Sequence, residues 1–255
     1  MVEQEALAYV NMYGVLGALE DLCRIDEEAR AIVAGIETPV ALCLAVTGGP
    51  CCTFSFSKDG CTMTEGEQGC NAKMSFASPE KFNAFIAEAK PGTPTKGLVR
   101  TLKFLTGPFT RLTDRLSAVL QAKEEDLLAD RALFEENTIM TMYVIAGAIP
   151  ALANHDSISR VSASNTVDGE IQMGIKDCVT VSLQVADHVF KTVKAPAANP
   201  RAIMEFADLD LAWGLFNGKV STINELCKGT IHMAGMISMI DNVNRILDRV
   251  AVYLA

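Results

Sequence analysis

The chain has 255 residues, of which 49% are hydrophobic and 21% are charged, and its net charge is −9. This composition is typical of a soluble globular protein with enough apolar side chains for about two domains. A surface this acidic repels phosphate backbones, which argues against a nucleic acid as the main partner. The first residues lack the basic and apolar regions of a signal peptide, so we expect a cytoplasmic protein with reduced cysteines.

Segments of the first half recur in the second half at an offset of about 130 residues. Residues 12–22 align with residues 142–152, with five of eleven positions identical. At the same offset, Met74 aligns with Met204 and Phe76 with Phe206. The alternative is that two similar patterns of helices and strands coincide, but a shared offset over this distance favours a repeat. The repeat predicts two tandem domains, residues 1–122 and 123–255.

The predicted elements follow the same order in both halves: an apolar helix, strands with alternating apolar side chains, a short helix and a closing helix. In the first half these are a helix at 6–22, strands near 40–46, 52–56 and 74–76, a short helix after Ser78 and a helix at 110–120. In the second half they are a helix at 132–152, strands near 171–175, 179–183 and 204–206, a short helix after Asp208 and a helix at 237–254. A Lys-Gly pair also occurs in both halves, at residues 96–97 and 228–229.

Motifs for nucleotide binding, zinc proteases and serine hydrolases are missing from the sequence. The three histidines (His155, His188 and His232) are scattered and have no counterpart in the first half. A catalytic histidine duplicated with its domain would occur in both halves. We therefore predict a protein that is not an enzyme, with no catalytic residue and no cofactor.

Four cysteines lie close together in the first half, at Cys51, Cys52, Cys61 and Cys70. Structural zinc sites usually pair cysteines about two to four residues apart, and this spacing does not fit that pattern. The second half has no matching cluster. We favour buried, inert thiols over a metal or redox site, and we predict no metal.

The order of residues 202–208, 215–219, 228–231, Gly235 and the terminal helix resembles the C-terminal half of the sterol carrier protein type 2 family. The first half is similar in a more diverged form, because residues 87–90 replace the Gly-Lys that ends the short helix in the family. The resemblance implies an α+β fold in which each domain has a five-stranded, mostly antiparallel sheet covered by helices. It also implies an apolar tunnel that holds a fatty acyl chain, acyl-CoA, sterol or other lipid without transforming it.

By matching positions, the resemblance supplies candidate ligand-binding residues in both domains. In the first domain they are Phe54, Phe56, Met74, Phe76, Phe82 and Phe85, and in the second Val181, Leu183, Met204, Phe206, Trp213 and Phe216. Each of these side chains can equally be plain core packing. The function we expect is binding or carriage of a lipid. The alternatives are an enzyme that holds a hydrophobic substrate and a structural module with a filled core.

One stretch, residues 90–116, departs from the acidic average with six basic residues and one acid. Leu98, Leu102, Leu105 and Phe109 recur there at steps of four and three, which gives an apolar stripe with basic flanks. The stretch is a candidate for transient contact with a membrane or an acidic partner. The alternative is an ordinary helix that packs on its own sheet.

Overall fold

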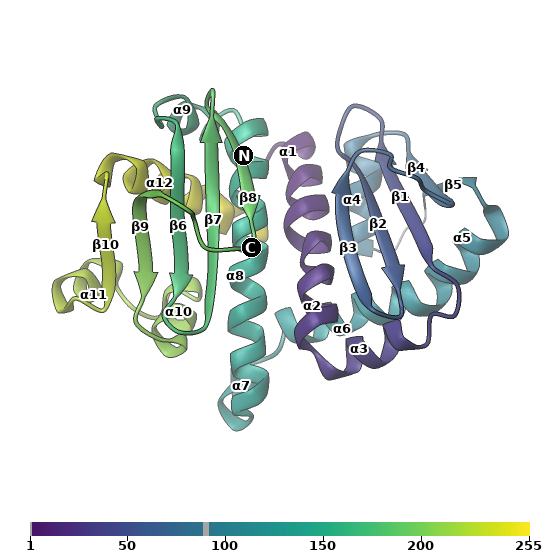
Figure 1. Cartoon of the computed structure of the whole chain (residues 1–255), viewed down its shortest axis with the longest axis horizontal. Coiled ribbons are helices and arrows are strands. Elements are labelled where there is room, and N and C mark those ends of the chain that lie inside the picture. Colours follow the sequence, from purple (N-terminus) through teal and green to yellow (C-terminus); the bar gives the residue numbers. More distant parts are fainter. Residues whose placement is uncertain (1, 89–91) are drawn as a thin grey trace. The chain divides into compact units, whose positions relative to one another are not determined.

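A computed structural model describes residues 2–88 and 92–255. The chain divides into two compact units, Met1–Glu136 and Asn137–Ala255 (Figure 1). The division falls inside the long helix α8 (Arg131–His155), whereas the sequence-based prediction placed it at residue 122. In the described part of the chain, no helix combines the length and the apolar character needed to cross a membrane.

Unit 1 begins with helices, continues with five strands and ends with helices. Its elements are α1 (Gln4–Tyr9), η1 (Val10–Val15), η2 (Leu16–Ala18), α2 (Leu19–Ile25), α3 (Glu27–Ala34), β1 (Val40–Val46), β2 (Cys51–Ser57), β3 (Gly60–Glu65), β4 (Ala72–Phe76), α4 (Pro79–Glu88), β5 (Thr93–Lys96), α5 (Leu98–Phe104), η3 (Leu105–Phe109), α6 (Thr110–Leu120) and α7 (Glu124–Ala129). The apolar first helix predicted at 6–22 is therefore a run of helical segments that includes a π-helical turn, η1.

Unit 2 takes most of α8 as its first helix and then follows a similar order. Its further elements are α9 (Ser159–Ser164), β6 (Gly169–Ile175), β7 (Val179–Ala186), β8 (Val189–Val193), β9 (Pro200–Phe206), α10 (Leu209–Phe216), α11 (Thr222–Lys228), β10 (Ile231–Gly235) and α12 (Ile237–Leu254). Helices α6 and α12 have the bounds that the sequence pattern predicted.

The two sheets have the same strand order. In unit 1 it is β3-β2-β1-β4-β5, and in unit 2, read in the same direction, it is β8-β7-β6-β9-β10. The register also agrees, because Met74 pairs with Leu44 of β1 and Met204 pairs with Met173 of β6. The residues aligned by sequence, Met74 with Met204, thus hold equivalent places in their sheets.

Both sheets are mixed, which corrects the expected mostly antiparallel arrangement. β1 pairs in parallel with β4, and β6 with β9, while the neighbouring pairs are antiparallel. The reason lies in the connection between β3 and β4. Both strands run in the same direction as β1, so the chain must travel from the last residue of β3 back to the opposite end of the strands before β4 begins. The returning segment is held on the sheet by Thr53, whose hydroxyl accepts a hydrogen bond from the backbone N–H of Gln68 at 3.0 Å.

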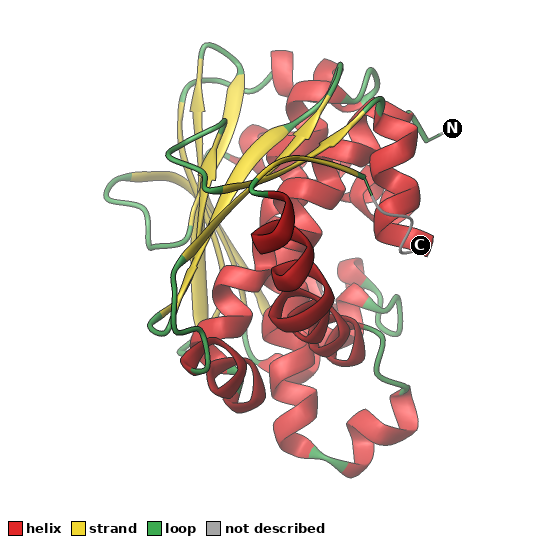
Figure 2. Ribbon diagram, turned by 90° about the vertical axis from the view of Figure 1, so that its right-hand side faces the viewer, coloured by secondary structure: helices red, strands yellow, loops and turns green. Residues whose placement is uncertain are grey.

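In each unit the helices lie on one face of the sheet (Figure 2). We call the other face the open face, although in unit 1 the segment between β3 and β4 crosses part of it. The covered face of sheet 1 carries buried side chains such as Leu42, Phe54 and Met74, whereas the open face carries small or polar ones such as Ala41 and Ser55. Burial of the alternating apolar side chains under the helices is the main source of stability.

In each unit, the helical segment that follows the sheet starts after a glycine in left-handed conformation. Gly97 (φ 62°) precedes α5 and Gly235 (φ 80°) precedes α12, and a Cβ at either would lie within 2.4 Å of a carbonyl oxygen on the neighbouring chain segment. Gly97 therefore corresponds to Gly235. This corrects the predicted match of Gly97 with Gly229, because Gly229 ends α11.

Candidate functional site

The predicted ligand-binding residues lie between the sheet and the helices of their own units. Nine of the twelve are closely packed, with exposed fractions between 0% and 6%: Phe54, Phe56, Met74, Phe76, Phe82, Val181, Leu183, Met204 and Phe206. The other three, Phe85, Trp213 and Phe216, are half-buried. The tunnel itself stays a prediction.

In unit 1 the aromatic residues form two groups. The ring of Phe76 lies 5.1 Å from that of Phe82 and 5.2 Å from that of Phe85, which joins β4 to α4. The second group centres on Phe56, whose ring lies 5.0 Å from that of Phe104 on α5 and 6.2 Å from that of Phe109. Phe104 was not named from the sequence; it lies one residue before Leu105 of the predicted apolar stripe.

A buried amide pair fixes α4 over this interior. Asn11 in η1 donates a hydrogen bond to the side-chain oxygen of Asn83 at 3.0 Å, and the Asn83 amide donates to the carbonyl of Gln4 at 2.9 Å. Buried amides must be hydrogen-bonded to be stable, and each of these contacts joins α4 to the first helical run. The position of Phe82 and Phe85 is therefore set by α4 as a rigid element.

In unit 2 the equivalent helix is α10, and it is only partly packed. Its small residues Ala212 and Gly214 are buried, whereas its large apolar side chains are half-exposed. Those side chains are Leu211, Trp213, Leu215 and Phe216. The ring of Phe216 lies 5.8 Å from that of Phe206 on β9, edge to face. An apolar helix surface thus borders the packed interior.

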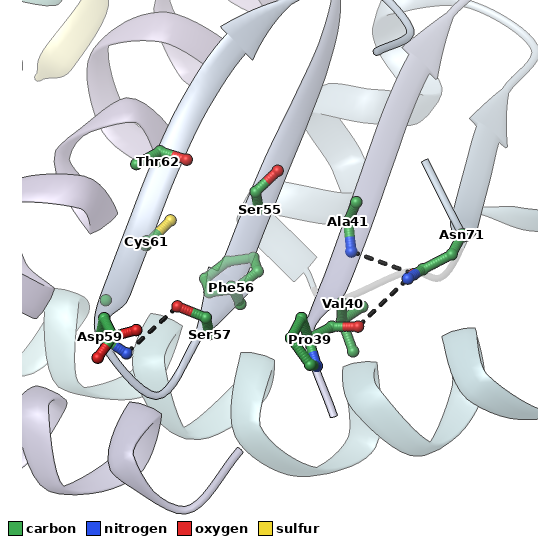
Figure 3. Close-up of a pocket in the computed structure, with 11 residues that line it drawn as sticks. Pro39, Val40, Ala41, Ser55, Phe56, Ser57, Asp59, Cys61, Thr62 and Asn71 are labelled. Carbon is green, nitrogen blue, oxygen red and sulfur yellow. Dashed lines mark hydrogen bonds between the residues drawn. The ribbon is translucent and has the colours of Figure 1, made fainter. Parts of the chain in front are cut away.

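A cavity of about 310 Å³ lies elsewhere, at the end of sheet 1 where β1 and β3 begin (Figure 3). Its lining includes Ala41, Ser55 and Thr62, which are paired across β1, β2 and β3 on the open face. Asn71 closes one side, accepting a hydrogen bond from the Ala41 N–H at 3.1 Å and donating to the Pro39 carbonyl at 3.2 Å. Of the predicted ligand-binding residues, only Phe56 takes part in this lining.

The cavity exists because the side chains in this row are short. At the same register in sheet 2 the row consists of Glu170, Gln184 and Lys191. The Gln184 amide donates a hydrogen bond to Glu170 at 3.1 Å, and these long side chains occupy the corresponding surface. A row of short side chains in unit 1 therefore leaves a depression on the open face, outside the interior between the sheet and the helices.

Each unit contains a buried aspartate bound to an arginine of its closing helix, α6 in unit 1 and α12 in unit 2. In unit 1, Asp26 caps α3 by accepting a hydrogen bond from Ala29 N, and Arg115 donates to it at 2.8 Å and 3.1 Å. In unit 2, Asp156 accepts from Ser159 N at 2.8 Å, and Arg249 donates to both its oxygens at 2.9 Å and 3.2 Å. Neither pair was identified from the sequence.

The signal for the aspartates was present in the sequence, because Asp26 and Asp156 also differ by 130 positions. Burial alone would raise the pKa of Asp156, but the hydrogen bonds from Arg249, Ser159 and Tyr253 lower it below its usual range. The role of both pairs is to hold the closing helix against the helices that precede the sheet.

Unit 1 has a second carboxyl group at its pair. Glu136 accepts a hydrogen bond from Arg115 at 3.0 Å. Burial and the charge of Asp26 raise the pKa of Glu136 to about 7. The pKa of Asp26 moves in the opposite direction: burial opposes its ionisation, but the hydrogen bonds from Arg115 and Ala29 lower it. Glu136 is thus the group that carries a proton near neutral pH.

Three of the buried cysteines have the properties of inert side chains. Burial raises the pKa of Cys23, Cys43 and Cys52 to about 12, so these thiols are protonated at neutral pH. The sulfur atoms of Cys43 and Cys51 lie 3.8 Å apart on the open face of sheet 1. Within residues 2–88 and 92–255, no three His, Cys, Asp or Glu side chains gather in a way that could hold a metal ion.

The basic stretch at 90–116 separates into two parts, and Lys90 lies outside the described residues. Leu105, Phe109, Leu112 and Leu116 are buried at 0–8% exposure, and α6 packs against α2 and α3 of its own unit. Leu98 and Leu102 on α5 are exposed instead. The apolar stripe is therefore not one continuous surface.

No family model matches the sequence, and neither does any curated protein. The chain is similar to solved structures of smaller proteins. One, described as a UbiJ-SCP2 ubiquinone synthesis protein, shares 11% identity and a TM-score of 0.34, over 42% of this chain and 91% of that one. A sterol carrier protein 2 shares 17% identity and a TM-score of 0.33, over 43% of this chain and 92% of that one.

A third solved structure is a conserved hypothetical protein from Thermus thermophilus, described as a candidate sterol carrier protein. It shares 18% identity and a TM-score of 0.33, over 43% of this chain and 85% of that one. Likenesses at these values do not assign a family or a ligand.

Proposed function

We propose that the protein binds a hydrophobic ligand, such as a fatty acyl chain or another lipid, between the sheet and the helices and releases it unchanged. In this proposal the two units are copies of one lipid-binding domain. The shared strand order and the equal register of Met74 and Met204 support the repeat. Methionine adapts its shape to irregular apolar ligands, which suits a side chain at the centre of such a site.

One observation carries the proposal: in both units, the helix after the fourth strand leaves aromatic side chains half-exposed beside a packed phenylalanine. Phe85 borders Phe76 in unit 1, and Phe216 borders Phe206 in unit 2. These side chains keep apolar surface in contact with water, which is unfavourable by about 25 cal/mol per Å², and an apolar ligand beside them would cover that surface. Displacement of these rings would open a route to the interior.

The direct test is to purify the chain, extract it with organic solvent and identify bound lipid by mass spectrometry. Delipidated protein is then titrated with a long-chain fatty acid while the fluorescence of Trp213, the only tryptophan, is recorded. We expect a saturable change, because Trp213 lies on α10 at the margin of the unit 2 interior. No bound lipid and no response to lipids of different classes would support a filled, structural core.

An enzyme that holds a hydrophobic substrate is the second candidate, and one observation favours it. The Glu136 carboxyl, with a pKa raised to about 7 by burial and by Asp26, could act as a general acid or base near neutral pH. Its hydrogen bond to Arg115 instead suits a structural role, since unit 2 keeps the pair without this carboxyl. A turnover with a pH profile that titrates near 7, lost in Glu136→Gln, would support the enzyme.

A further inference from the structure

We propose that α5 docks the protein onto an anionic lipid surface. This narrows the contact expected for residues 90–116 to a helix of two turns, at the edge of sheet 1 beside β5 (Figure 1). The inference rests on the proposed function for its purpose, which is the exchange of a lipid with a membrane. The binding itself needs no ligand site, so it can be measured separately.

The first observation is an apolar surface on α5. The exposed fractions of Leu98, Val99 and Leu102 are 57%, 79% and 45%. The opposite side of the helix is buried, with Thr101 at 0% and Phe104 at 4%. Three large aliphatic side chains on the solvent side of one short helix form a contiguous apolar patch, which is typical of an interaction site.

The second observation is positive charge next to this patch. Arg100 and Lys103 are exposed and lie three residues apart, so they share one side of the helix beside Val99. Within the residues that the structure describes, neither of them forms an ion pair. On a chain with a net charge of −9, two uncompensated cations beside an apolar patch are complementary to an anionic headgroup layer.

The shape of the surface favours lipid over a protein partner. The aliphatic side chains project from a helix rather than line a groove, and long basic side chains can reach headgroups while their neighbours enter the apolar layer. α5 also leads directly into the interior, because the ring of its last residue, Phe104, lies tilted against the ring of Phe56, with 5.0 Å between the ring centres. A membrane bound at α5 would lie close to the proposed ligand site of the same unit.

Unit 2 lacks this combination. Its corresponding helix, α12, begins with Ile237, which is 56% exposed, but its first five residues include Asp241 and no basic residue. The surface at α5 is therefore a property of unit 1 and not of the shared fold.

The test measures cosedimentation of the full chain with vesicles of phosphatidylcholine alone and of phosphatidylcholine mixed with phosphatidylglycerol. We expect binding to the anionic vesicles that weakens with added salt. R100Q/K103Q should weaken it by about 25-fold, since each cation near an anionic surface contributes about 1 kcal/mol, or roughly fivefold. L98S/V99S/L102S should weaken it by roughly tenfold or more, because the apolar insertion is lost.

Matched controls exist elsewhere in the chain. I158S/V161S/I223S removes three aliphatic side chains with exposed fractions of 55%, 63% and 73%, and K58Q/K176Q removes two exposed lysines. Both should keep the binding of the original protein. All these positions are exposed, so circular dichroism should show unchanged folding. As a second measurement, Leu102→Trp in a Trp213→Phe background should shift its emission to the blue on anionic vesicles only.

Equal binding to both kinds of vesicle, equal losses in the control variants, or no binding to anionic vesicles would overturn the inference. If the emission of Leu102→Trp stays unchanged on anionic vesicles, α5 does not enter a lipid layer. That result would also overturn the inference and would favour an acidic protein as the partner. Lipid extraction reports the proposed function separately. If vesicle binding depends on α5 but no lipid copurifies, the docking surface stands and the carrier function fails.

Discussion

The two units use the same buried Asp–Arg pair, but they surround it differently. In unit 2, Asp156 is completely buried and receives hydrogen bonds from Arg249, Ser159 and the hydroxyl of Tyr253. In unit 1, Arg115 is 23% exposed and is shared between Asp26 and a second carboxyl, Glu136. In unit 2 the neutral donors Ser159 and Tyr253 complete the site, whereas in unit 1 the titratable carboxyl of Glu136 completes it.

The difference shows that the pair and its surroundings have separate effects. The pair holds the closing helix in both units, whereas the third group decides how the unit responds to pH. The ionised Asp156 contributes stability above its usual pKa of 3.8, and this is lost as the pH falls towards its lowered folded value. The Asp156 site should therefore be insensitive to pH near neutrality, whereas the site of Asp26 and Glu136 should not.

The largest effect is expected from Arg249→Ala, which leaves Asp156 charged and buried. Loss of one partner of a buried pair costs about 3–5 kcal/mol of unfolding free energy. Urea unfolding monitored by the fluorescence of Trp213, which lies in unit 2, should show this decrease in unfolding free energy. Arg245→Ala, at an exposed pair with Asp241, should cost about 0–1 kcal/mol.

Arg115→Ala, followed by circular dichroism, should cost less than Arg249→Ala because Arg115 is more exposed. Equal costs for the two variants would mean that the surroundings of the pair do not matter.

The packed phenylalanines offer a second comparison between the units. Phe76 contacts two rings on α4, whereas Phe206 contacts one ring on α10. Phe76→Ala should therefore cost about 3–5 kcal/mol, as in a fully packed core, and Phe206→Ala should cost less. Thermal unfolding of both variants gives the two values. A full cost at Phe206 would argue against a ligand space in unit 2.

A pH-dependent effect is expected from Glu136→Gln. The folded chain holds a proton on Glu136 up to about pH 7, whereas the unfolded chain releases it near the usual value of 4.5. Unfolding therefore releases a proton between these values, so the free energy of unfolding falls as the pH rises through the window.

In Glu136→Gln this decrease should be reduced, which urea unfolding at about pH 5 and about pH 8 would measure. Glu135→Gln is the matched control. Glu135 is the residue next to Glu136, but its side chain is 47% exposed and pairs with Arg131. If the variant and the original protein lose the same stability on raising the pH, Glu136 is not the group responsible.

The smallest effect is expected from giving unit 1 the long side chains of unit 2. Ser55→Gln with Thr62→Lys should fill the depression on the open face of sheet 1 and change the unfolding free energy by no more than about 0.5 kcal/mol. Lipid binding should also be unchanged, because the depression lies outside the apolar interior. A loss of lipid binding would place the ligand on the open face.

Much of the secondary structure followed from the sequence, because local patterns control it. The periods of apolar residues predicted α6 and α12 with their observed bounds, and the alternation around Met74 and Met204 predicted β4 and β9. The common offset of 130 residues predicted equivalent places for these strands, and the register confirms them. A period is a property of neighbouring residues, so it needs no knowledge of distant contacts.

Only the tertiary structure decided what depends on residues far apart in the chain. The parallel pairing of β1 with β4 results from a segment that crosses the sheet, which no local pattern reveals. Asp26 meets Arg115 across 89 positions, and a sequence shows charges but not their burial. Trp213 was placed correctly on its helix, yet its half exposure depends on which side of α10 faces the strand. The same holds for residues 98–116, where one apolar pattern divides into an exposed part on α5 and a buried part on η3 and α6, because α2 and α3 cover only the later helix.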